Sequence, residues 1–350
     1  MTPQRTVRVA VNGYGVIGKR VADAIALQRD MTLVGISDVA TDWRMRIVTR
    51  KGFDLFGGTQ EHVRAMEKAG LRVAGTLNEL LSQVDVVVDC TPKKLGAKNA
   101  EAYRRAGVKF IVEGGEEHAV AGHSFVAEAN YASALGREAT RIVSCNTTSI
   151  VRTLTALKRA GLLLRARGTL LRRATDPWES HLSGIMNTLV PESHIPSHQD
   201  PDAQSVDPEL DVVTMAVKVP ETLGHLHYWA VQLTRPAEKG EVLSALASST
   251  RIAFISWQDG LSGINTVHEL MADIGRPYEN LYEVALWEDL VTVHGGEAFF
   301  GYLVDNQAIV VPETIDAIRA LTEIERDPRA SIEATNSSLG ISNRLLKQAA

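Results

Sequence analysis

A strand-like segment, a glycine-rich turn and a helix-like segment follow one another near the start of the chain. Residues 6–12 are apolar and β-rich, residues 18–28 have apolar side chains at helical spacing, and Gly13-x-Gly15-x-x-Gly18 joins the two. Such glycines permit a tight turn, a close approach of backbone to a pyrophosphate and close packing of helix on strand, while the helix N-terminus offers N–H donors. The pattern predicts a dinucleotide-binding site. The alternative is a glycine turn that binds no ligand.

Strands and helices continue to alternate up to residue 144. This alternation predicts a parallel sheet covered by helices on both faces. After Cys145 the segments become longer and alternate in polarity, which favours a mostly antiparallel sheet. The predicted fold class is α/β, with a Rossmann dinucleotide-binding domain followed by an α+β catalytic domain. The predicted strands of the first part are 32–37, 84–89, 109–113 and 141–144, and those of the second part are 168–173, 211–219, 226–234 and 298–304.

This change of pattern predicts two domains. The dinucleotide-binding domain is expected at 1–144, and the catalytic, substrate and oligomerisation domain at 145–329. A helix is predicted at 311–325. The tail from Asn336 is predicted to form a further helix, and we expect the segment 330–350 to pack back on the first domain.

The composition excludes several classes of protein. The 350 residues are 45% hydrophobic and 23% charged, as in an ordinary globular protein. A net charge of −5 gives no general affinity for nucleic acid or an anionic membrane, and no apolar run approaches the ~18 residues of a membrane span. With only two cysteines, Cys90 and Cys145, a disulfide framework and a CxxC metal pattern are excluded, so no metal is expected. The few cysteines and the absence of a leader segment indicate a reducing, cytoplasmic setting.

Asp38 ends the second predicted strand, twenty residues after Gly18. A carboxylate there can accept hydrogen bonds from both ribose hydroxyls and repels a 2′-phosphate, which predicts NAD in preference to NADP. The alternative is that Asp38, with Ser37, caps a turn. Four nearby cations could still hold a 2′-phosphate: Arg44, Arg46, Arg50 and Lys51.

Two further loops follow predicted parallel strands, at the ends where such sheets bind ligands. Thr91 and Pro92 follow one strand, and Gly114 and Gly115 follow another. We expect them to line the nicotinamide side of the cofactor crevice. For each, the alternative is an ordinary loop residue.

Cys145 stands between a predicted strand and a predicted helix, in the run Ser144-Cys145-Asn146-Thr147-Thr148. A cysteine at a helix N-terminus is expected to have a lowered pKa, and the thiolate is its reactive form. Small polar neighbours keep the sulfur accessible and can donate hydrogen bonds to an oxyanion. Cys90, at an apolar strand, fits the commoner role of a buried structural cysteine. Cys145 is therefore predicted to act as a covalent nucleophile in aldehyde oxidation beside a nicotinamide cofactor.

Covalent aldehyde oxidation also needs a base for the hemithioacetal hydroxyl proton. His225 and His227, in Gly-His-Leu-His-Tyr, lie at the start of a predicted strand of the second domain. We expect only one of them to face the cleft. The residues alone leave open which one, and each has a structural role as its alternative.

The whole chain resembles the archaeal-type, or type II, glyceraldehyde-3-phosphate dehydrogenases. The matching segments run almost from end to end: AVNGYGVIGKRVADAI, VDVVVDCTP, VEGGEEH, IVSCNTTSIVRT, LLRRATD, MNTLVPE, IPSH, LDVVTMAVKVPETLGHLHYW, IVVPETIDAIRA and TNSSLGI. The resemblance implies that Cys145 is the nucleophile within a Ser144-Cys145-Asn146 substrate motif and that His225 is the base. It also implies a homotetramer.

The resemblance assigns further binding roles. Val16, Ile17 and Gly115 would contact the cofactor, Arg173 would lie at the cofactor and phosphate end of the cleft with Arg172, and His198 would bind substrate phosphate. The implied reaction forms a thiohemiacetal of glyceraldehyde 3-phosphate on Cys145 and passes hydride to NAD or NADP. Inorganic phosphate then cleaves the thioester to give 1,3-bisphosphoglycerate.

Three positions depart from the family pattern. Gln199 follows His198 where the family has a second histidine; it can donate a hydrogen bond to phosphate but carries no charge. Asn306, with Gln307 next to it, aligns with a family glutamine that contacts the cofactor. Asp38 stands where many members carry a lysine suited to NADP.

Other functions fit the same residues. Aspartate-semialdehyde and N-acetyl-glutamyl-phosphate reductases share the two-domain plan, but their motifs match poorly. Erythrose 4-phosphate is an alternative substrate because of Gln199. A cofactor-binding redox sensor without catalysis is the alternative from another class, and the presence of Cys145, His225 and the arginines argues against it.

Overall fold

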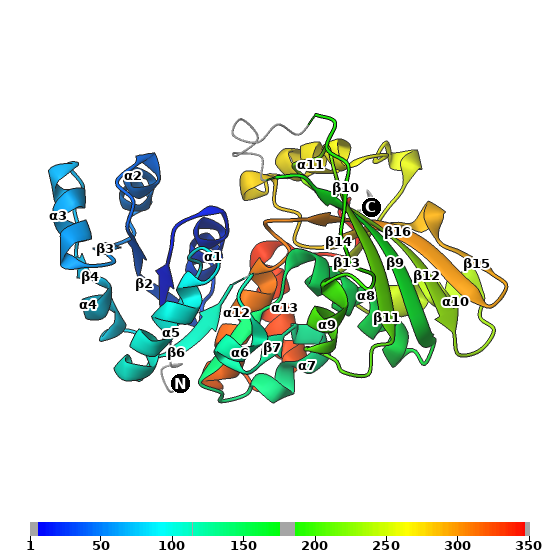
Figure 1. Cartoon of the computed structure of the whole chain (residues 1–350), viewed down its shortest axis with the longest axis horizontal. Helices are drawn as coiled ribbons and strands as arrows, with labels where there is room; N and C mark the ends of the chain where they lie inside the picture. Colours follow the sequence, from blue (N-terminus) through cyan, green and yellow to red (C-terminus); the bar gives the residue numbers. More distant parts are fainter. Residues whose placement is uncertain (1–5, 114, 176–185, 347–350) are drawn as a thin grey trace. The chain divides into compact units, whose positions relative to one another are not determined.

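The computed structural model describes residues 6–113, 115–175 and 186–346 (Figure 1). The chain divides into two compact units. Unit 1 comprises residues 1–144 and 311–340, and unit 2 comprises residues 145–310 and 341–350. The helix predicted at 311–325 therefore groups with the first part of the chain, although the predicted second domain extended to residue 329. No helix of the described residues is long and apolar enough to cross a membrane.

Unit 1 is built on an eight-stranded sheet of order β4-β3-β2-β1-β5-β6-β8-β7, in which all the pairs are parallel. The strand order reverses beside β1, so the carboxyl ends of β1 and β5 flank a switch point, the usual ligand site of such sheets. The predicted Rossmann domain is confirmed. Its strands are β1 (Val7–Asn12), β2 (Met31–Asp38), β3 (Leu55–Gly57), β4 (Gly75–Thr76), β5 (Val86–Asp89), β6 (Lys109–Val112), β7 (Ser124–Phe125) and β8 (Ala139–Ile142).

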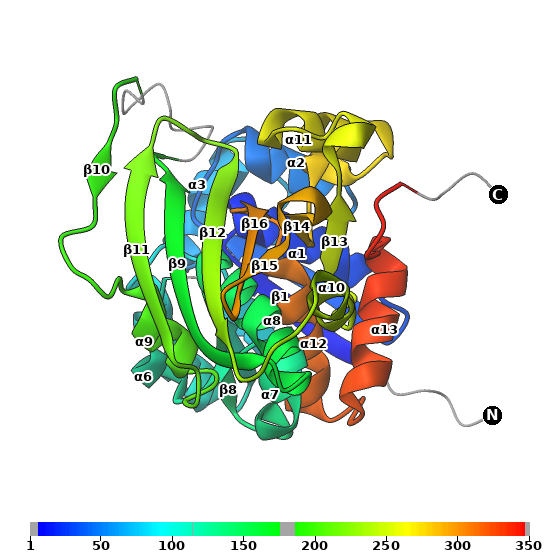
Figure 2. The same ribbon diagram turned by 90° about the vertical axis from the view of Figure 1, so that its right-hand side faces the viewer.

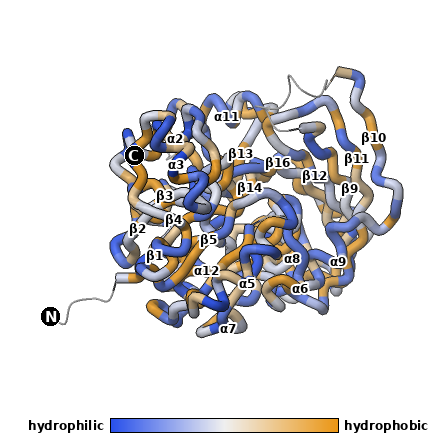
Figure 3. Tube along the Cα trace, turned by 60° about the vertical axis from the view of Figure 1, so that its left-hand side comes forward, coloured by the Kyte–Doolittle hydropathy of each residue, from blue (hydrophilic) through white to orange (hydrophobic). Residues whose placement is uncertain are grey.

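Helices cover this sheet. α12 contacts β5, β6 and β8, and α5 contacts β6. Hydrophobic and hydrophilic residues alternate along the helices, as expected for helices that cover a sheet (Figure 3). The helices of unit 1 are α1 (Val16–Ala26), α2 (Trp43–Arg50), α3 (Gln60–Lys68), α4 (Leu77–Leu81), α5 (Leu95–Ala106), α6 (His118–Ala121), α7 (Ala127–Ala134), α12 (Val311–Thr322) and α13 (Pro328–Leu339).

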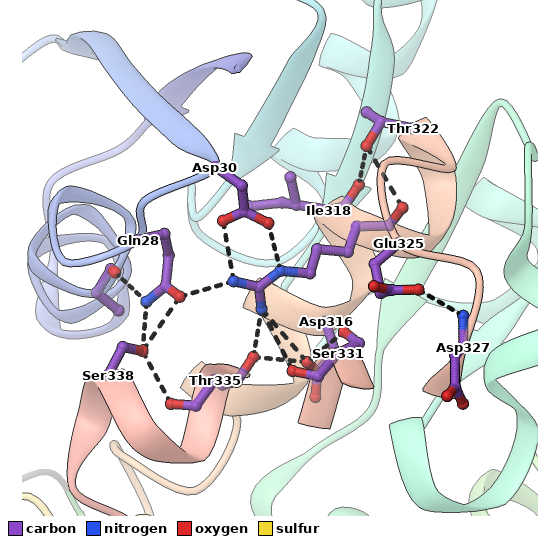
Figure 4. A network of polar contacts seen from close by, with 12 residues as sticks. Gln28, Asp30, Asp316, Ile318, Thr322, Glu325, Asp327, Ser331, Thr335 and Ser338 are labelled. Atoms are coloured by element: carbon purple, nitrogen blue, oxygen red, sulfur yellow. Dashed lines mark hydrogen bonds and ion pairs between the residues drawn. The ribbon is translucent and has the colours of Figure 1, made fainter. Parts of the chain in front are cut away.

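A buried arginine ties the C-terminal helices to the N-terminal part of unit 1 (Figure 4). Arg319 of α12 is 2% exposed, and its guanidinium donates to both carboxylate oxygens of Asp30 at 2.7 and 3.0 Å. It also donates to Gln28, after α1, and to the hydroxyl of Thr335 on α13. A buried charge needs such a set of partners. The network explains why 311–340 belongs to unit 1.

Arg319→Ala leaves Asp30 and Gln28 without this donor. We expect the free energy of unfolding to fall by about 3–5 kcal/mol, the usual effect of breaking a buried ion pair. Urea unfolding followed by circular dichroism measures it. Arg326→Ala is the matched control, because Arg326 lies near the surface in a pair with Glu323 and its side chain is 73% exposed. A loss below 1 kcal/mol for Arg319→Ala would contradict the role of the network.

The predicted helix from Asn336 is wrong in position. α13 instead spans Pro328–Leu339. Asp327 caps it by accepting from the backbone N–H of Arg329, and Gly340 ends it in the left-handed conformation at φ 68°. Past Gly340 the described chain is not helical and groups with unit 2. There the backbone of Arg344 forms an isolated parallel β-bridge with that of Phe254. Residues 347–350 lie outside the described part.

Unit 2 is built on a mixed sheet of order β10-β11-β9-β12-β16-β14-β13, with β15 on β16. Its pairs are antiparallel except β9 with β11 and β13 with β14, so the predicted, mostly antiparallel sheet is confirmed. Figure 2 shows β11, β9 and β12 side by side as long twisted strands. The strands are β9 (Leu163–Arg173), β10 (Val190–Pro191), β11 (Val212–Val219), β12 (Gly224–Leu233), β13 (Ile252–Ile255), β14 (Val284–Trp287), β15 (Thr292–His294) and β16 (Glu297–Asp305).

Helix α8 carries the start of unit 2. It begins at Cys145 and contacts β9 and β16, and its residues from Asn146 to Leu157 are buried. The α-helices in the described part of unit 2 are α8 (Cys145–Arg159), α9 (Gln199–Gln204), α10 (Lys239–Ala247) and α11 (Ile264–Asp273).

Candidate active site

The three glycines of the turn in unit 1 differ in what surrounds them and in why glycine fits each position. Gly13 has φ +94°, which favours glycine. A Cβ on Gly18 would lie 1.9 Å from the carbonyl oxygen of Gly13, so close packing of α1 on the turn requires glycine. A Cβ on Gly15 would meet nothing within 4 Å. Among the described residues no contact requires glycine at position 15, and the space over the start of α1 is open. Val16 and Ile17 form the first turn of α1, directly after Gly15.

Asp38 holds its own turn. Its Oδ1 accepts from the backbone N–H groups of Val39 and Ala40, at 2.7 and 2.9 Å, and its Oδ2 accepts from Tyr14 N–H at 2.7 Å. The turn-capping alternative therefore describes part of its role. Among the described residues Oδ2 has only this one donor, and its remaining lone pairs can accept from a ribose.

Two of the four nearby cations are engaged by carboxylates. Arg44 forms a bidentate pair with Asp42, at 2.6 Å for the shortest contact, and Lys51 pairs with Asp23 at 2.6 Å. Both pairings lower the positive charge offered to a 2′-phosphate.

A buried carboxylate organises the loop after β5. Asp89 is 2% exposed, and its Oδ1 accepts from both the backbone N–H and the hydroxyl of Thr91. Its Oδ2 accepts from Tyr103 at 2.6 Å, and Tyr103 in turn accepts from Asn12 at the end of β1. Thr91 is thus tied to the ends of β1 and β5. This role of Asp89 could not be predicted from the sequence, because an aspartate at the end of a strand has no characteristic partner.

The second predicted loop is described only in part. Gly115 has φ +111° and lies beside Lys93, whose nearest side-chain atom would be 3.7 Å from a Cβ. Gly114 lies outside the described residues.

The nucleophile candidate and a histidine meet in unit 2. Cys145 Sγ, at the first position of α8, lies 3.3 Å from Nε2 of His225 on β12. The Nδ1 of His225 accepts from the backbone N–H of Arg173 at 3.1 Å. Because a neutral imidazole has one donor and one acceptor nitrogen, this contact places the proton on Nε2, the nitrogen that faces the sulfur.

Burial dominates the electrostatics of this pair. Burial raises the pKa of the Cys145 thiol, and the smaller opposite effects of Arg173, the Asn146 backbone N–H and Arg172 do not cancel it. The lowered pKa expected at a helix N-terminus is therefore wrong for the unliganded protein. Burial, with His227 and the two arginines, also lowers the pKa of His225 well below its ordinary value, so its ring is neutral.

Alkylation of Cys145 by iodoacetamide tests these charges, because only the thiolate reacts. We expect the rate to keep rising above pH ~8.5, the ordinary pKa of a cysteine. Arg173→Gln removes the strongest of the lowering influences, so alkylation at pH 8 should slow. Peptide mass spectrometry separates Cys145 from Cys90.

The matched control is Arg167→Gln, an exposed arginine on the same strand, which should leave the rate unchanged. A rate that reaches its plateau below pH 8 would show that burial does not govern the pKa of Cys145.

Both candidate histidines lie in the site, so the expectation that only one faces it is wrong. Side chains two apart on a strand share a face. His227 is fully buried, with Nε2 2.8 Å from Oδ1 of Asn146 and Nδ1 3.1 Å from the hydroxyl of Tyr302 on β16. His225 contacts the sulfur, and His227 contacts the next residue of α8.

Two of the predicted phosphate-binding residues contact Glu192, which the sequence motifs did not single out. Arg172 donates to Oε2 of Glu192 at 3.2 Å, and His198 contacts Oε1 at 2.5 Å. Burial raises the pKa of Glu192, but His198 and Arg172 outweigh it, and the net pKa is lowered. The carboxylate thus holds two groups that can turn to an anionic ligand.

Gln199 is fully buried, which differs from its predicted contact with substrate. Its side-chain amide contacts the hydroxyl of Ser197 and Nε2 of His198. The buried Gln199 amide contacts the His198 ring at 2.8 Å and so helps to orient it. The His198 side chain is exposed, so it can reach a ligand, whereas Gln199 cannot.

The remaining predicted residues lie near the unit boundaries. Ser144 is the last residue of unit 1 before α8, and Asn306 is 8% exposed after β16 in unit 2. Asp305, next to Asn306, accepts from the backbone N–H groups of Leu281 and Gln307. Among the described residues no cluster of three or more histidine, cysteine or acidic side chains could hold a metal ion.

Comparison with protein-family models matches both units. Residues 144–274 match the model of the glyceraldehyde 3-phosphate dehydrogenase C-terminal domain, and residues 7–115 match that of the dihydrodipicolinate reductase N-terminus.

Similar curated proteins extend over nearly the whole chain. Proteins of Methanococcoides burtonii and Metallosphaera sedula are each 44% identical over 336 residues, which cover 96% of this chain and 99% and 98% of theirs. A protein of Methanosarcina mazei is 42% identical over 335 residues, 95% of this chain and 99% of its own. All three are named glyceraldehyde-3-phosphate dehydrogenase.

Proposed function

The chain belongs to the glyceraldehyde-3-phosphate dehydrogenase family, in its archaeal-type class, and we propose that it is the phosphorylating enzyme. It oxidises glyceraldehyde 3-phosphate to 1,3-bisphosphoglycerate with NAD and inorganic phosphate, as a step of glycolysis or gluconeogenesis, in the cytoplasm. The observation that carries this proposal is the 3.3 Å contact between Cys145 Sγ and His225 Nε2.

The first step is attack on the aldehyde. The Cys145 thiol first gives up its proton to solvent, because His225 already carries a proton on Nε2. The thiolate then forms a bond to the carbonyl carbon, the electron pair of the C=O bond moves to the oxygen, and the oxygen becomes an oxyanion. His225, with its proton on Nε2, can donate to the sulfur before attack and to the oxyanion afterwards. This role differs from the base inferred from the family resemblance, because Nδ1 is already occupied by the Arg173 N–H. Hydride then leaves the same carbon, and the oxyanion collapses to a thioester without loss of a proton.

The second step releases the product. A phosphate oxygen attacks the thioester carbon, and the second oxyanion again accepts from His225. The carbon–sulfur bond breaks, the acyl phosphate leaves, and the Cys145 thiolate is regenerated. Arg172 and His198, both held by Glu192, are suited to bind the substrate phosphate or the attacking phosphate.

The residues of unit 1 suit a dinucleotide. The open space over Gly15 and the N-terminus of α1 are suited to a pyrophosphate. In this proposal Val16, Ile17, Thr91 and Gly115 are the neighbouring cofactor contacts. Arg173 and Asn306 are the further cofactor contacts expected from the family. When bound, the nicotinamide accepts the hydride.

Asp38 favours NAD over NADP in this proposal. We expect a higher kcat/KM with NAD, and Asp38→Ala should reduce that preference by about tenfold or more, since a hydrogen bond to a charged group contributes about 1.5–3 kcal/mol. Steady-state kinetics with both cofactors measure this. Thermal melting of the variant is the control, because Asp38 also holds its turn. A wild-type preference for NADP would remove Asp38 as the determinant.

An aldehyde and cofactor panel, run with and without inorganic phosphate, tests the function. We expect phosphate-dependent NADH formation with glyceraldehyde 3-phosphate and a lower kcat/KM with erythrose 4-phosphate. Cys145→Ser should abolish turnover and keep cofactor binding, whereas Cys90→Ser should keep turnover. Oxidation that does not depend on phosphate would indicate a non-phosphorylating enzyme. Failure with every phosphorylated aldehyde would favour the redox-sensor alternative.

A homotetramer is part of the proposal. The sheet of unit 2 has a groove of about 440 Å³ lined by apolar and aromatic side chains, among them Met215, Tyr228 and Phe299. Met215 and Tyr228 are each 47% exposed. Exposed apolar surface of this kind is typical of a protein–protein contact.

A further inference from the structure

His227 connects the residue after the nucleophile to the interior of unit 2. Its Nε2 lies 2.8 Å from Oδ1 of Asn146, and its Nδ1 lies 3.1 Å from the hydroxyl of Tyr302. All three side chains are buried, and the rings of His227 and Tyr302 pack with their centroids 5.0 Å apart. In the sequence analysis His227 has no role except as the alternative to His225 for the catalytic base.

The two contacts define a single tautomer. Burial, with a smaller effect of Arg172, lowers the pKa of His227 to about 3, so the ring is neutral at working pH. A neutral ring donates from one nitrogen and accepts at the other. Because Oδ1 of Asn146 can only accept, Nε2 carries the proton, and Nδ1 accepts the hydroxyl proton of Tyr302.

This tautomer orients the side-chain amide of Asn146. With Oδ1 bound to His227, the amide nitrogen Nδ2 is left, and it has no hydrogen-bond partner among the described residues. The backbone N–H of Asn146 lowers the pKa of the Cys145 thiol, and Asn146 directly follows the nucleophile in α8. The amide donor therefore belongs to the residue next to the nucleophile, whose sulfur becomes bonded to the carbon that carries the oxyanion.

We propose that His227 is a positioning residue that holds the Asn146 amide with Nδ2 directed to the oxyanion formed on Cys145. This inference rests on the proposed function. When sulfur attacks, the carbonyl oxygen takes up the electron pair of the C=O bond and accepts hydrogen bonds from Nδ2 of Asn146 and Nε2 of His225. Both donors keep their protons, and the electron pair returns when hydride leaves.

A role in packing alone makes a different prediction. An apolar side chain at position 227 could fill the same space beside Tyr302. It would leave Oδ1 of Asn146 without its donor, and the amide could then turn and present oxygen instead of nitrogen to the oxyanion. Loss of the Nε2 proton of His227 should therefore lower kcat and leave the alkylation rate of Cys145 unchanged.

Asn146→Ala tests the donor. Removal of one oxyanion donor typically lowers kcat about 10²–10³-fold, and we expect a loss of this size with a small change in KM. Iodoacetamide should alkylate Cys145 at the wild-type rate, because the nucleophile is intact. Thr155→Val is the control on the same helix. It replaces a buried hydroxyl that has no hydrogen-bond partner within the described part of the chain, and kcat should not change.

His227→Leu and His227→Gln test the positioning. Leucine removes the donor to Oδ1 and should lower kcat strongly, whereas glutamine restores an N–H donor and should recover most of the loss. Tyr302→Phe keeps the ring and removes the hydroxyl, which contacts Nδ1 of His227 at 3.1 Å and Oγ of Ser149 at 3.4 Å. It should lower kcat about two- to tenfold, the range expected for one ordinary hydrogen bond, and it serves if His227→Leu does not fold.

Three results would overturn the inference. They are full kcat in Asn146→Ala, equal losses in the leucine and glutamine variants at 227, and an unchanged kcat in Tyr302→Phe. Each would leave the proposed function standing, because wild-type oxidation of glyceraldehyde 3-phosphate is measured in the same assay. Absence of oxidation by the wild type would overturn the proposed function and this inference together.

Discussion

The chemistry of the protein depends on one contact, between Cys145 at the first position of α8 and His225 on β12. The contact exists because α8 begins at the nucleophile and because β12 pairs with β9, whose last residue, Arg173, donates its backbone N–H to the other side of the His225 ring. α8 therefore positions the sulfur, β12 positions the imidazole, and the backbone of β9 determines which ring nitrogen carries the proton. A helix N-terminus alone would offer a cysteine, but not a partner with its proton directed at the sulfur.

Two opposing effects act on the pKa of the Cys145 thiol. Burial favours the neutral thiol, while the two arginines at the end of β9 and the Asn146 N–H favour the thiolate. A sulfur that is neutral without substrate is protected from indiscriminate reaction, and fixed donors stabilise charge when it develops on the substrate oxygen. Near this pair, the single carboxylate of Glu192 contacts both Arg172 and His198 and so holds both side chains in place.

Much of the fold could be predicted from local patterns. The Gly13–Gly18 turn, the parallel strands of unit 1 and the antiparallel preference of unit 2 depend on periodicity and on glycine geometry, which the sequence displays directly. The residues that were missed act over long sequence distances. Asp89 acts through Tyr103, Glu192 through His198, and Arg319 through Asp30, 289 positions away. The helix at the C-terminus was misplaced because Asp327, Pro328 and Gly340 define its ends more strongly than apolar spacing does.

Intact-mass spectrometry of the enzyme mixed with glyceraldehyde 3-phosphate and NAD, without inorganic phosphate, tests the central claim most directly. The account predicts a stoichiometric acyl adduct on Cys145, confirmed by peptide mapping, that disappears with release of 1,3-bisphosphoglycerate when phosphate is added. Cys145→Ser should form no adduct. NADH formed in a stoichiometric burst without any adduct on Cys145, or an adduct on Cys90 instead, would contradict it.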